Sequence, residues 1–356
     1  MSTWLIVVTL AVALAACQGA GGTGAPPSAV TSAPPPSGES TGEPSAEPVA
    51  EPETRQVTIG YTTPDFAQII PFKWFDDLEA AGYELEIVEF ESGTVLNRAM
   101  IADQVDLALG SVLSVIQLAQ ETGGGARIIA SDNTSPDYIM LAPSSISSVT
   151  ELTGKRLGIS GPGDISDVLS KLALSRSGVD PANVEIVQIG GTNARIAGLV
   201  AGQIDAGIAH AAEAYSALEE HPDLRDILSI GEIVPDLMQR GLLTTDEFIQ
   251  ANPVLTQILV DGFIDATRWA ADNKAEYIAL SEEHVEGLSD AIRDRAYDTF
   301  IEIEMFGVNG GISDEVLENV LALNKEIGVL EDDAPGIDVW ADNSFAEDYL
   351  ARNGER

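Results

Sequence analysis

Short β-branched runs alternate with amphipathic helical runs over the first half of the folded region, from residue 57 to residue 142. Alternation of this kind is typical of an α/β fold. The pattern predicts strands at 57–61, 83–90, 107–109, 127–130 and 138–142. It predicts the intervening helices at 66–81, 95–103 and 112–121.

The same order of elements then begins again, with predicted strands at 156–160, 184–189 and 206–209 and helices at 165–177, 193–201 and 211–219. Without a gap, Val88 to Gly110 matches Val187 to Ala209, a shift of 187 − 88 = 99 residues. Alternating α/β chains always resemble themselves a little, but an ungapped register of this length favours a true duplication. Two copies of one unit predict two similar lobes, each a mostly parallel sheet with flanking helices.

Beyond Pro235 the pattern becomes helical. Residues 253–273 carry an amphipathic stripe of apolar side chains, and further helices are predicted at 289–306, 313–327 and 345–352. Ser289 and Ser313 stand as N-caps ahead of acidic first turns. We expect these helices to cover the first lobe.

The N-terminus indicates the compartment. An apolar run from Leu5 to Ala13 is too short for a bilayer core, which needs ~20 apolar residues, but fits the central region of a signal peptide. Leu14-Ala15-Ala16-Cys17 resembles the bacterial lipobox, in which the cysteine is diacylated and becomes the new N-terminus. No Lys or Arg precedes Leu5, which departs from that pattern. An ordinary secretory signal with an incidental cysteine is the alternative.

From residue 18 to about residue 54 the chain consists mainly of Gly, Pro, Ser, Thr, Ala and Glu. Such a segment has almost nothing to bury, so we expect a disordered tether that holds a folded domain away from a membrane. The sequence therefore predicts a signal peptide at 1–17, lipidation of Cys17, and an extracytoplasmic protein anchored to the cell membrane.

The charge is strongly acidic, with 57 Asp and Glu against 18 Lys and Arg and a net charge of −39. Nucleic acid and anionic lipid repel such a surface, so we expect no nucleic-acid partner and membrane contact through the lipid anchor only. Adaptation to a salty medium is a weaker explanation of the same composition. Cys17 is the only cysteine in the sequence, which excludes an internal disulfide.

Specific motifs appear in the second repeat. Gly191-Thr192-Asn193 and the run from Gly198 to Ala206, with Gly-Gln-Ile-Asp-Ala at its end, resemble solute-binding proteins for alkanesulfonates, taurine, nitrate and thiamine-pyrimidine precursors. Residues 149–158 resemble that family's step into the second lobe, and Ala251-Asn252-Pro253 before a long helix also fits. The similarity spans roughly Gln56 to Leu350.

This resemblance implies a two-lobed periplasmic-binding-protein fold of type II, closing on its ligand by hinge motion. It places lobe 1 at 55–142 and 241–356 and lobe 2 at 143–240, with crossings near 142–149 and 233–241. It also implies a monomeric substrate-binding component of an ABC importer, which captures a small solute and delivers it to the permease subunit.

In open α/β sheets, ligands bind beyond the carboxyl ends of the strands. The loops there are rich in glycine, which admits a ligand close to the backbone, and they lead into helix starts with free N–H groups. The candidate ligand-binding residues are Thr62, Thr63, Asp65, Phe66, Ser92, Gly93, Thr94, Gly110, Ser111, Asn133, Gly161, Gly163, Asp164, Thr192, Asn193, His210 and Glu213. The alternative is that the polar members only cap helices.

The ligand itself is less well indicated. None of these loops contains Lys or Arg, and we expect Arg98 and Arg195, on the following helices, to face solvent. The acidic and aromatic residues near the predicted mouth are Asp65, Glu91, Asp164, Glu213, Tyr61, Phe66 and Trp74. Aromatic rings stack on flat ligands and carboxylates attract cations, so we favour a neutral or weakly cationic heteroaromatic such as a pyrimidine over a sulfonate or nitrate.

Two other classes of function remain open. A eukaryotic relative of the thiamine-precursor binders is a pyrimidine synthase with a cysteine-rich iron-binding motif, which this sequence lacks. His210, His221 and His284 are scattered without metal-ligand spacing, so we expect no catalysis, no metal and no cofactor. A lipoprotein domain that senses the solute for a membrane kinase is the second alternative.

Overall fold

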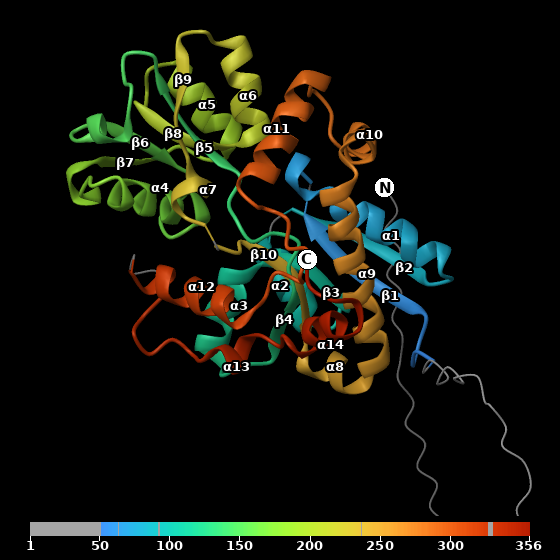
Figure 1. The fold of residues 1–356 in the computed structure, drawn as a ribbon. Coiled ribbons are helices and arrows are strands. Elements are labelled where there is room, and N and C mark those ends of the chain that lie inside the picture. The colour runs from blue at the N-terminus through green and yellow to red at the C-terminus, as the bar shows by residue number, and fades with distance from the viewer. Residues whose placement is uncertain (1–50, 63, 92, 236, 327–329) are drawn as a thin grey trace, which may run out of the picture. The chain divides into compact units, whose positions relative to one another are not determined.

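The computed structural model describes residues 51–62, 64–91, 93–235, 237–326 and 330–356 (Figure 1). The predicted signal peptide, Cys17 and the tether up to residue 50 lie outside these residues. Within them the chain forms two five-stranded sheets with flanking helices, which confirms the expected α/β class.

The first sheet has the strand order β2-β1-β3-β10-β4. Its strands are β1 (Gln56–Thr62), β2 (Glu84–Phe90), β3 (Leu107–Ser111), β4 (Ala126–Ala130) and β10 (Arg240–Thr245). The second sheet has the order β7-β6-β8-β5-β9. Its strands are β5 (Tyr138–Pro143), β6 (Arg156–Ile159), β7 (Glu185–Gln188), β8 (Ala206–His210) and β9 (Leu224–Ser229).

Each sheet is mixed rather than purely parallel. β10 is antiparallel to both β3 and β4, and β5 is antiparallel to both β8 and β9, whereas the other pairs are parallel. One strand of each sheet therefore runs against the other four. In both sheets that strand is the one that arrives from the other half of the chain, since β5 follows β4 and β10 follows β9.

The two sheets repeat one register as well as one topology. Gly60 lies opposite Val88 in the first sheet, and Gly158 lies opposite Val187 in the second. The partner strands are therefore related by 187 − 88 = 99 residues, the shift predicted from the ungapped match.

An aspartate performs the same task in each repeat. The backbone N–H of Thr58 donates to Asp106 Oδ2 at 2.8 Å, and that of Arg156 donates to Asp205 Oδ2 at 2.9 Å. Each aspartate precedes the third strand of its repeat and ties it to the start of the first strand. These matching contacts confirm the predicted duplication.

The helices of the two repeats are α1 (Ile70–Ala80), α2 (Gly93–Ile101), α3 (Val112–Thr122), α4 (Ile165–Arg176), α5 (Thr192–Val200), α6 (Ala211–Glu220) and α7 (Ile230–Ile233). Short 3-10 turns stand at η1 (Phe66–Gln68), η2 (Val149–Leu152) and η3 (Pro181–Asn183). The single helix predicted at 66–81 is in fact η1 followed by α1. The break lies before Pro71, which has no N–H to donate and therefore stands in the first turn of α1.

The C-terminal third is helical, as predicted. Its helices are α8 (Asp246–Ala251), α9 (Pro253–Asp272), α10 (Lys274–His284), α11 (Asp290–Glu302), α12 (Asp314–Glu326), α13 (Ile337–Trp340) and α14 (Ser344–Asn353). Ser289 accepts from the N–H of Ile292 at 3.3 Å and Ser313 from that of Val316 at 3.4 Å, so both act as the expected N-caps.

One C-terminal helix does not pack where we expected. α11 lies against α6, a helix of the second repeat (Figure 1). The hydroxyl groups of Tyr215 and Thr299 are 2.7 Å apart, and the guanidinium of Arg295 lies 3.7 Å from the centre of the Tyr215 ring. The C-terminal helices therefore contact the second repeat as well as the first. An amphipathic stripe could not reveal this, because it predicts burial without specifying the surface that buries it.

The first crossing between the sheets also differs from the expectation. β5 begins at Tyr138 and already pairs with β8 and β9, so the chain passes from the first sheet to the second between Ala130 and Tyr138. The expected crossing at 142–149 falls after this point. A buried strand is equally apolar whichever of the two sheets it belongs to, so hydrophobicity alone could not place the boundary between the two halves of the chain.

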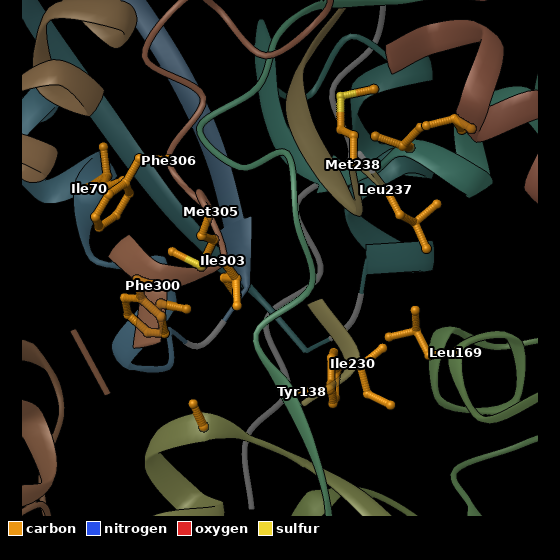
Figure 2. Close-up of a cluster of buried hydrophobic side chains, with 14 of the residues drawn as sticks. Ile70, Tyr138, Leu169, Ile230, Leu237, Met238, Phe300, Ile303, Met305 and Phe306 are labelled. Atoms are coloured by element: carbon orange, nitrogen blue, oxygen red, sulfur yellow. The ribbon is translucent and has the colours of Figure 1, made fainter. Parts of the chain in front are cut away.

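Apolar packing continues through the junction between the two sheets. A single cluster of buried hydrophobic side chains contains residues from both repeats and from the C-terminal helices. Figure 2 shows labelled members of this cluster from several segments: Ile70, Tyr138, Leu169, Ile230, Leu237, Met238, Phe300, Ile303, Met305 and Phe306. The crossing segments are thus embedded in the core rather than exposed as free linkers.

Gly60 and Gly158, which occupy equivalent positions in the two repeats, allow a test of how closely each sheet packs against its neighbouring side chains. A Cβ added at Gly60 would stand 2.3 Å from Leu96 Cδ1, and one at Gly158 would stand 2.5 Å from Ile204 Cδ1. We expect Gly60→Ala and Gly158→Ala each to lower the free energy of unfolding by about 1–3 kcal/mol, because the core must shift to admit a methyl group. Urea denaturation measures the change.

Gly191→Ala is the matched control, because a Cβ there meets no atom within 4 Å. We expect a change of less than about 0.5 kcal/mol for it. Equal destabilisation in all three variants would mean that close packing at Gly60 and Gly158 is not the cause.

Candidate functional site

A cavity of about 820 Å³ opens where the carboxyl ends of strands from both sheets meet the crossing segments. Thr62 and Ser111 contribute from the first sheet, His210 from the second, and Asn133 and Arg240 from the two crossings. This volume lies within the ~300–1,000 Å³ of sites for small organic ligands.

Eight of the candidate residues line this cavity: Thr62, Gly93, Gly110, Ser111, Asn133, Gly163, Asp164 and His210. Two of them also cap helices. Ser111 accepts from the N–H of Ser114 at 3.5 Å, and Asp164 accepts from that of Ser166 at 3.0 Å. Capping and lining the cavity are thus compatible roles for these side chains.

The other candidates that the structure describes do not line the cavity. Phe66 is 1% exposed and packs in the core, with its ring centre 5.4 Å from that of Tyr277. Asn193 is exposed, and Thr192 accepts a hydrogen bond from Arg195 at 3.1 Å. Gly161, Asp65 and Glu213 are likewise not lining residues. Thr63 and Ser92 lie outside the described residues, as does the side chain of Thr94.

His210 is the centre of a partly buried cluster at the cavity wall. Its Nδ1 lies 2.9 Å from Asp137 Oδ1, and its Nε2 lies 3.6 Å from Asp65 Oδ2. Burial alone would lower the pKa of His210, but the two carboxylates outweigh it and raise that pKa to about 10. His210 is therefore an imidazolium at neutral pH, with a carboxylate facing each ring nitrogen.

The two carboxylates come from different sheets. Asp137 immediately precedes β5 of the second sheet, whereas Asp65 follows β1 of the first. Asp65 is held by the N–H of Ala67 at 2.8 Å and by the side-chain amide of Gln68 at 2.7 Å. The imidazolium of His210 consequently links the strand-end loops of the two sheets across one side of the cavity.

Glu213 lies next to this cluster, in the first turn of α6. Burial raises its pKa to about 7, and the nearby Asp65 and Asp137 add to the shift despite the opposing charge of His210. Its Oε2 is buried and makes no hydrogen bond within the part of the chain that the structure describes. Glu213 is thus the carboxyl group of the cluster that titrates near neutral pH.

Arg240 is a cavity residue that the sequence did not reveal. Its Nε and Nη2 each lie 3.0 Å from one oxygen of the buried Asp132, and Nη2 also donates to the carbonyl of Ala67. Nη1 makes no hydrogen bond to the described residues. A search for ligand-binding residues after the carboxyl ends of the strands could not find Arg240. Arg240 is the first residue of β10, and β10 is antiparallel to the other strands of its sheet, so its start lies where their carboxyl ends lie.

Arg195 is buried rather than exposed as we expected, with 2% of its surface accessible. Its guanidinium donates to the carbonyls of Ile208 and Gly190 at 2.7 and 2.8 Å and to the hydroxyl groups of Ser160 and Thr192. By donating to these four acceptors, the guanidinium holds together the turns after β6 and β7. Arg195 therefore organises the loops and does not reach the ligand space.

The aromatic residues expected to stack on a ligand are also placed elsewhere. Trp74 is fully buried against Phe263, and Tyr61 packs against Phe72. The aromatic ring that does line the cavity is Tyr138, whose centre lies 4.1 Å from that of His210. The sequence could not reveal the place of Tyr138 at the cavity, because its pattern puts residues 138–142 in the first lobe, whereas β5 belongs to the second sheet.

The charged groups of the cavity wall are largely neutralised within the protein. Lys171 pairs with Asp167 at 2.8 Å, Arg240 with Asp132, and His210 with Asp137. The remaining polar groups of the wall are mainly amides and hydroxyls, at Thr62, Gln68, Ser111, Ser114, Gln117, Asn133, Tyr138, Gln239 and Asn324. Such a wall suits a polar ligand without a strong net charge.

In the described ranges, no group of three or more His, Cys, Asp or Glu side chains is arranged to hold a metal ion. Nor does any helix of these ranges combine the length and apolarity needed to cross a membrane.

Comparison with other proteins links the geometry to a family. The model of the family described as "NMT1/THI5 like" matches residues 74–277. No curated protein matches the sequence.

Solved structures share the fold. The periplasmic aliphatic sulphonate binding protein of Escherichia coli is 17% identical, with 80% of this chain and 97% of that one covered and a TM-score of 0.65. The periplasmic nitrate-binding protein of Synechocystis is 13% identical, with 85% and 90% covered and a TM-score of 0.65. The ligand-binding component of an ABC-type import system from Staphylococcus aureus, solved with zinc bound, is 13% identical, with 83% and 98% covered and a TM-score of 0.68. At such low identity these similarities establish the periplasmic-binding-protein fold alone.

Glu213 provides a pH test of the cluster. The folded protein keeps its proton up to a pH of about 7, whereas the unfolded chain releases it near 4.5, so the wild type loses stability as the pH rises between these values. We expect Glu213→Gln to match the wild type at pH 4 and to exceed its unfolding free energy at pH 8 by about 1–3 kcal/mol. Urea denaturation at several pH values measures this difference.

The control is Glu219→Gln, an exposed position on the same helix, for which we expect no pH-dependent difference. A Glu213→Gln effect that is constant from pH 4 to pH 8 would contradict a titrating carboxyl group.

Proposed function

Because this chain belongs to the NMT1/THI5 like family, we propose that it is the extracytoplasmic substrate-binding component of an ABC importer. In this role it captures a small organic solute and delivers it to a permease subunit. The proteins with the same fold that are named as sulphonate-binding, nitrate-binding and import-system components support the proposal.

The observation that carries the proposal is the cavity enclosed by both sheets. Each sheet with its flanking helices corresponds to one lobe in this interpretation, with the crossings before Tyr138 and before Arg240 as the hinge. The pair of His210 and Asp65, at 3.6 Å, would join the lobes when they close on the ligand. Such closure is how two-lobed binding proteins enclose a solute.

A binding role also fits the state of His210 better than catalysis does. A general base needs a free lone pair near the operating pH. Both ring nitrogens of His210 face carboxylates, and its pKa is raised to about 10 by Asp137 and Asp65 against the effect of burial. His210 therefore stays protonated and holds the site together.

We favour a neutral polar heteroaromatic ligand, such as an aminopyrimidine, over a sulfonate or nitrate. Tyr138 offers a ring for stacking beside the amides and hydroxyls of the wall. The cations at the wall already have partners in Asp132, Asp137 and Asp167. An anion would have to compete with these carboxylates for the paired cations of the wall.

Stacking on Tyr138 can be tested directly. We expect 4-aminopyrimidine to stabilise the protein in a thermal-shift screen, because a ligand that binds the folded state raises its stability by RT ln(1 + [L]/Kd). We expect Tyr138→Leu to weaken binding about ten-fold and Tyr138→Phe to retain it, since a stacked ring contributes about 0.5–1.5 kcal/mol beyond its area. Isothermal titration calorimetry measures the dissociation constants. Tight binding of taurine or nitrate with no binding of pyrimidines would reverse the ligand assignment.

The lipid anchor at Cys17 is part of the same proposal and rests on the lipobox resemblance. We expect the protein made in a bacterium to enter the detergent phase on Triton X-114 partition, and Cys17→Ser to remain in the aqueous phase. Each buried CH₂ of an acyl chain contributes about 0.8 kcal/mol to membrane binding, which explains the difference. A processed wild-type protein found in the aqueous phase would argue for an ordinary secretory signal.

A further inference from the structure

A wall of the cavity comes from a segment that strand-end loops do not include. Val320 and Asn324 of the C-terminal helix α12 line it, four residues apart and so on one face of that helix. On the side of the second sheet, Asp167 and Lys171 of α4 line the same cavity. We call these residues of α4 and α12 the α4–α12 wall.

The last turns of the two helices are in contact. Arg176 Nη2 of α4 lies 3.5 Å from Glu326 Oε2 of α12, at exposed positions beyond the cavity. α12 and α4 thus approach each other at the edge of the site. Because residues of both helices line the cavity, a ligand inside it can touch both helices at once.

The orientation of Asn324 is determined by its own helix. The side chain is 4% exposed, and its Nδ2 donates to the carbonyl of Val320 at 2.7 Å. A carbonyl can only accept, so the amide cannot be turned the other way. Oδ1 is left as an acceptor and makes no hydrogen bond to the described residues.

Asp167 also presents an unused acceptor. It is 2% exposed, and its Oδ2 accepts from the N–H of Gly163 and from Lys171 Nζ, both at 2.8 Å. Its Oδ1 is buried and makes no hydrogen bond to any described residue. A buried acceptor without a partner costs about 1–3 kcal/mol, which a donor on a ligand would recover.

We propose that the α4–α12 wall is a subsite for an amino group, or another N–H donor, of the bound solute, which Asp167 Oδ1 and Asn324 Oδ1 accept. This inference rests on the proposed solute-binding function and specifies the ligand further. The charge of Asp167 is already balanced by Lys171, so a neutral amine on a heterocycle suits the subsite without requiring a cation. Nη1 of Arg240 is a donor elsewhere on the same cavity wall and suits a ring nitrogen.

The test compares solutes that differ only by a methyl group in place of the amino group. The first pair is 4-aminopyrimidine with 4-methylpyrimidine, which tests a neutral amino group. The second pair is taurine with propane-1-sulfonate, in which the amino group of taurine is an ammonium at neutral pH, so heteroaromatic and sulfonate ligands are both covered. For the wild-type protein we expect the amino member to bind at least about ten-fold more tightly, because a site built to hydrogen-bond an N–H rejects the analogue that lacks it. Calorimetry gives the ratio of the two dissociation constants.

Two variants should abolish this preference. Asn324→Leu removes the acceptor, so the ratio should fall by about ten-fold, towards one. In Asp167→Asn the amide oxygen should stay with the donors of Gly163 and Lys171, which turns the NH₂ towards the ligand. We then expect the ratio to fall by about ten-fold or more, because two donors would face each other.

One control separates the subsite from a general effect of changing α12. Glu318→Gln removes a carboxylate from the exposed face of α12 and should leave the ratio within about two-fold. Thermal unfolding of each variant shows whether it is folded at the temperature of the titration.

The possible failures differ from one another. A wild-type protein that binds no solute in a broad screen would contradict the proposed function itself, and the subsite with it. Tight binding that is indifferent to the amino group and to Asn324→Leu would overturn only the subsite. That second result is the one expected if a buried water molecule, rather than the ligand, satisfies the two oxygens.

Discussion

The arrangement of the site depends on one partly buried charge, the imidazolium of His210 between Asp137 and Asp65. A charge that is largely removed from water is stable only if its N–H groups face acceptors. Since these acceptors stand on loops of different sheets, satisfying His210 also sets how the strand ends face each other. His210 also affects two neighbours: its charge lowers the pKa of Glu213 against the larger effect of burial, and its ring packs at a tilt against that of Tyr138.

The duplication explains why such a group can lie between two equivalent halves. Each sheet receives one antiparallel strand from the other half of the chain, and that exchange brings the strand ends of both repeats to one cavity. Arg240 begins one exchanged strand and Tyr138 begins the other. Both residues line the cavity because the crossing segments run along it. The wall therefore combines residues that are far apart in the sequence.

The pairing of charges within the cavity wall restricts the class of ligand that suits the cavity. An acidic protein with a net charge of −39 could be expected to attract a cation, yet His210, Arg240 and Lys171 each balance a carboxylate at the cavity. What the ligand meets is mainly a set of hydrogen-bonding groups of defined direction. Asp167 Oδ1 and Asn324 Oδ1, which accept no hydrogen bond from the described residues, matter more for the choice of ligand in this setting than the overall charge.

The sequence by itself determined the α/β class, the duplication and about half of the candidate cavity residues, because periodicity, strand-end glycines and helix caps are local properties. It could not place Phe66 and Trp74 in the core or Arg195 among backbone carbonyls, since burial depends on what packs above a side chain. The tertiary structure alone decided the crossing before Tyr138, the contact of α11 with α6, and the entry of Arg240 and Asn324 into the cavity. Each of these depends on contacts between residues distant in the chain, and no local pattern encodes them.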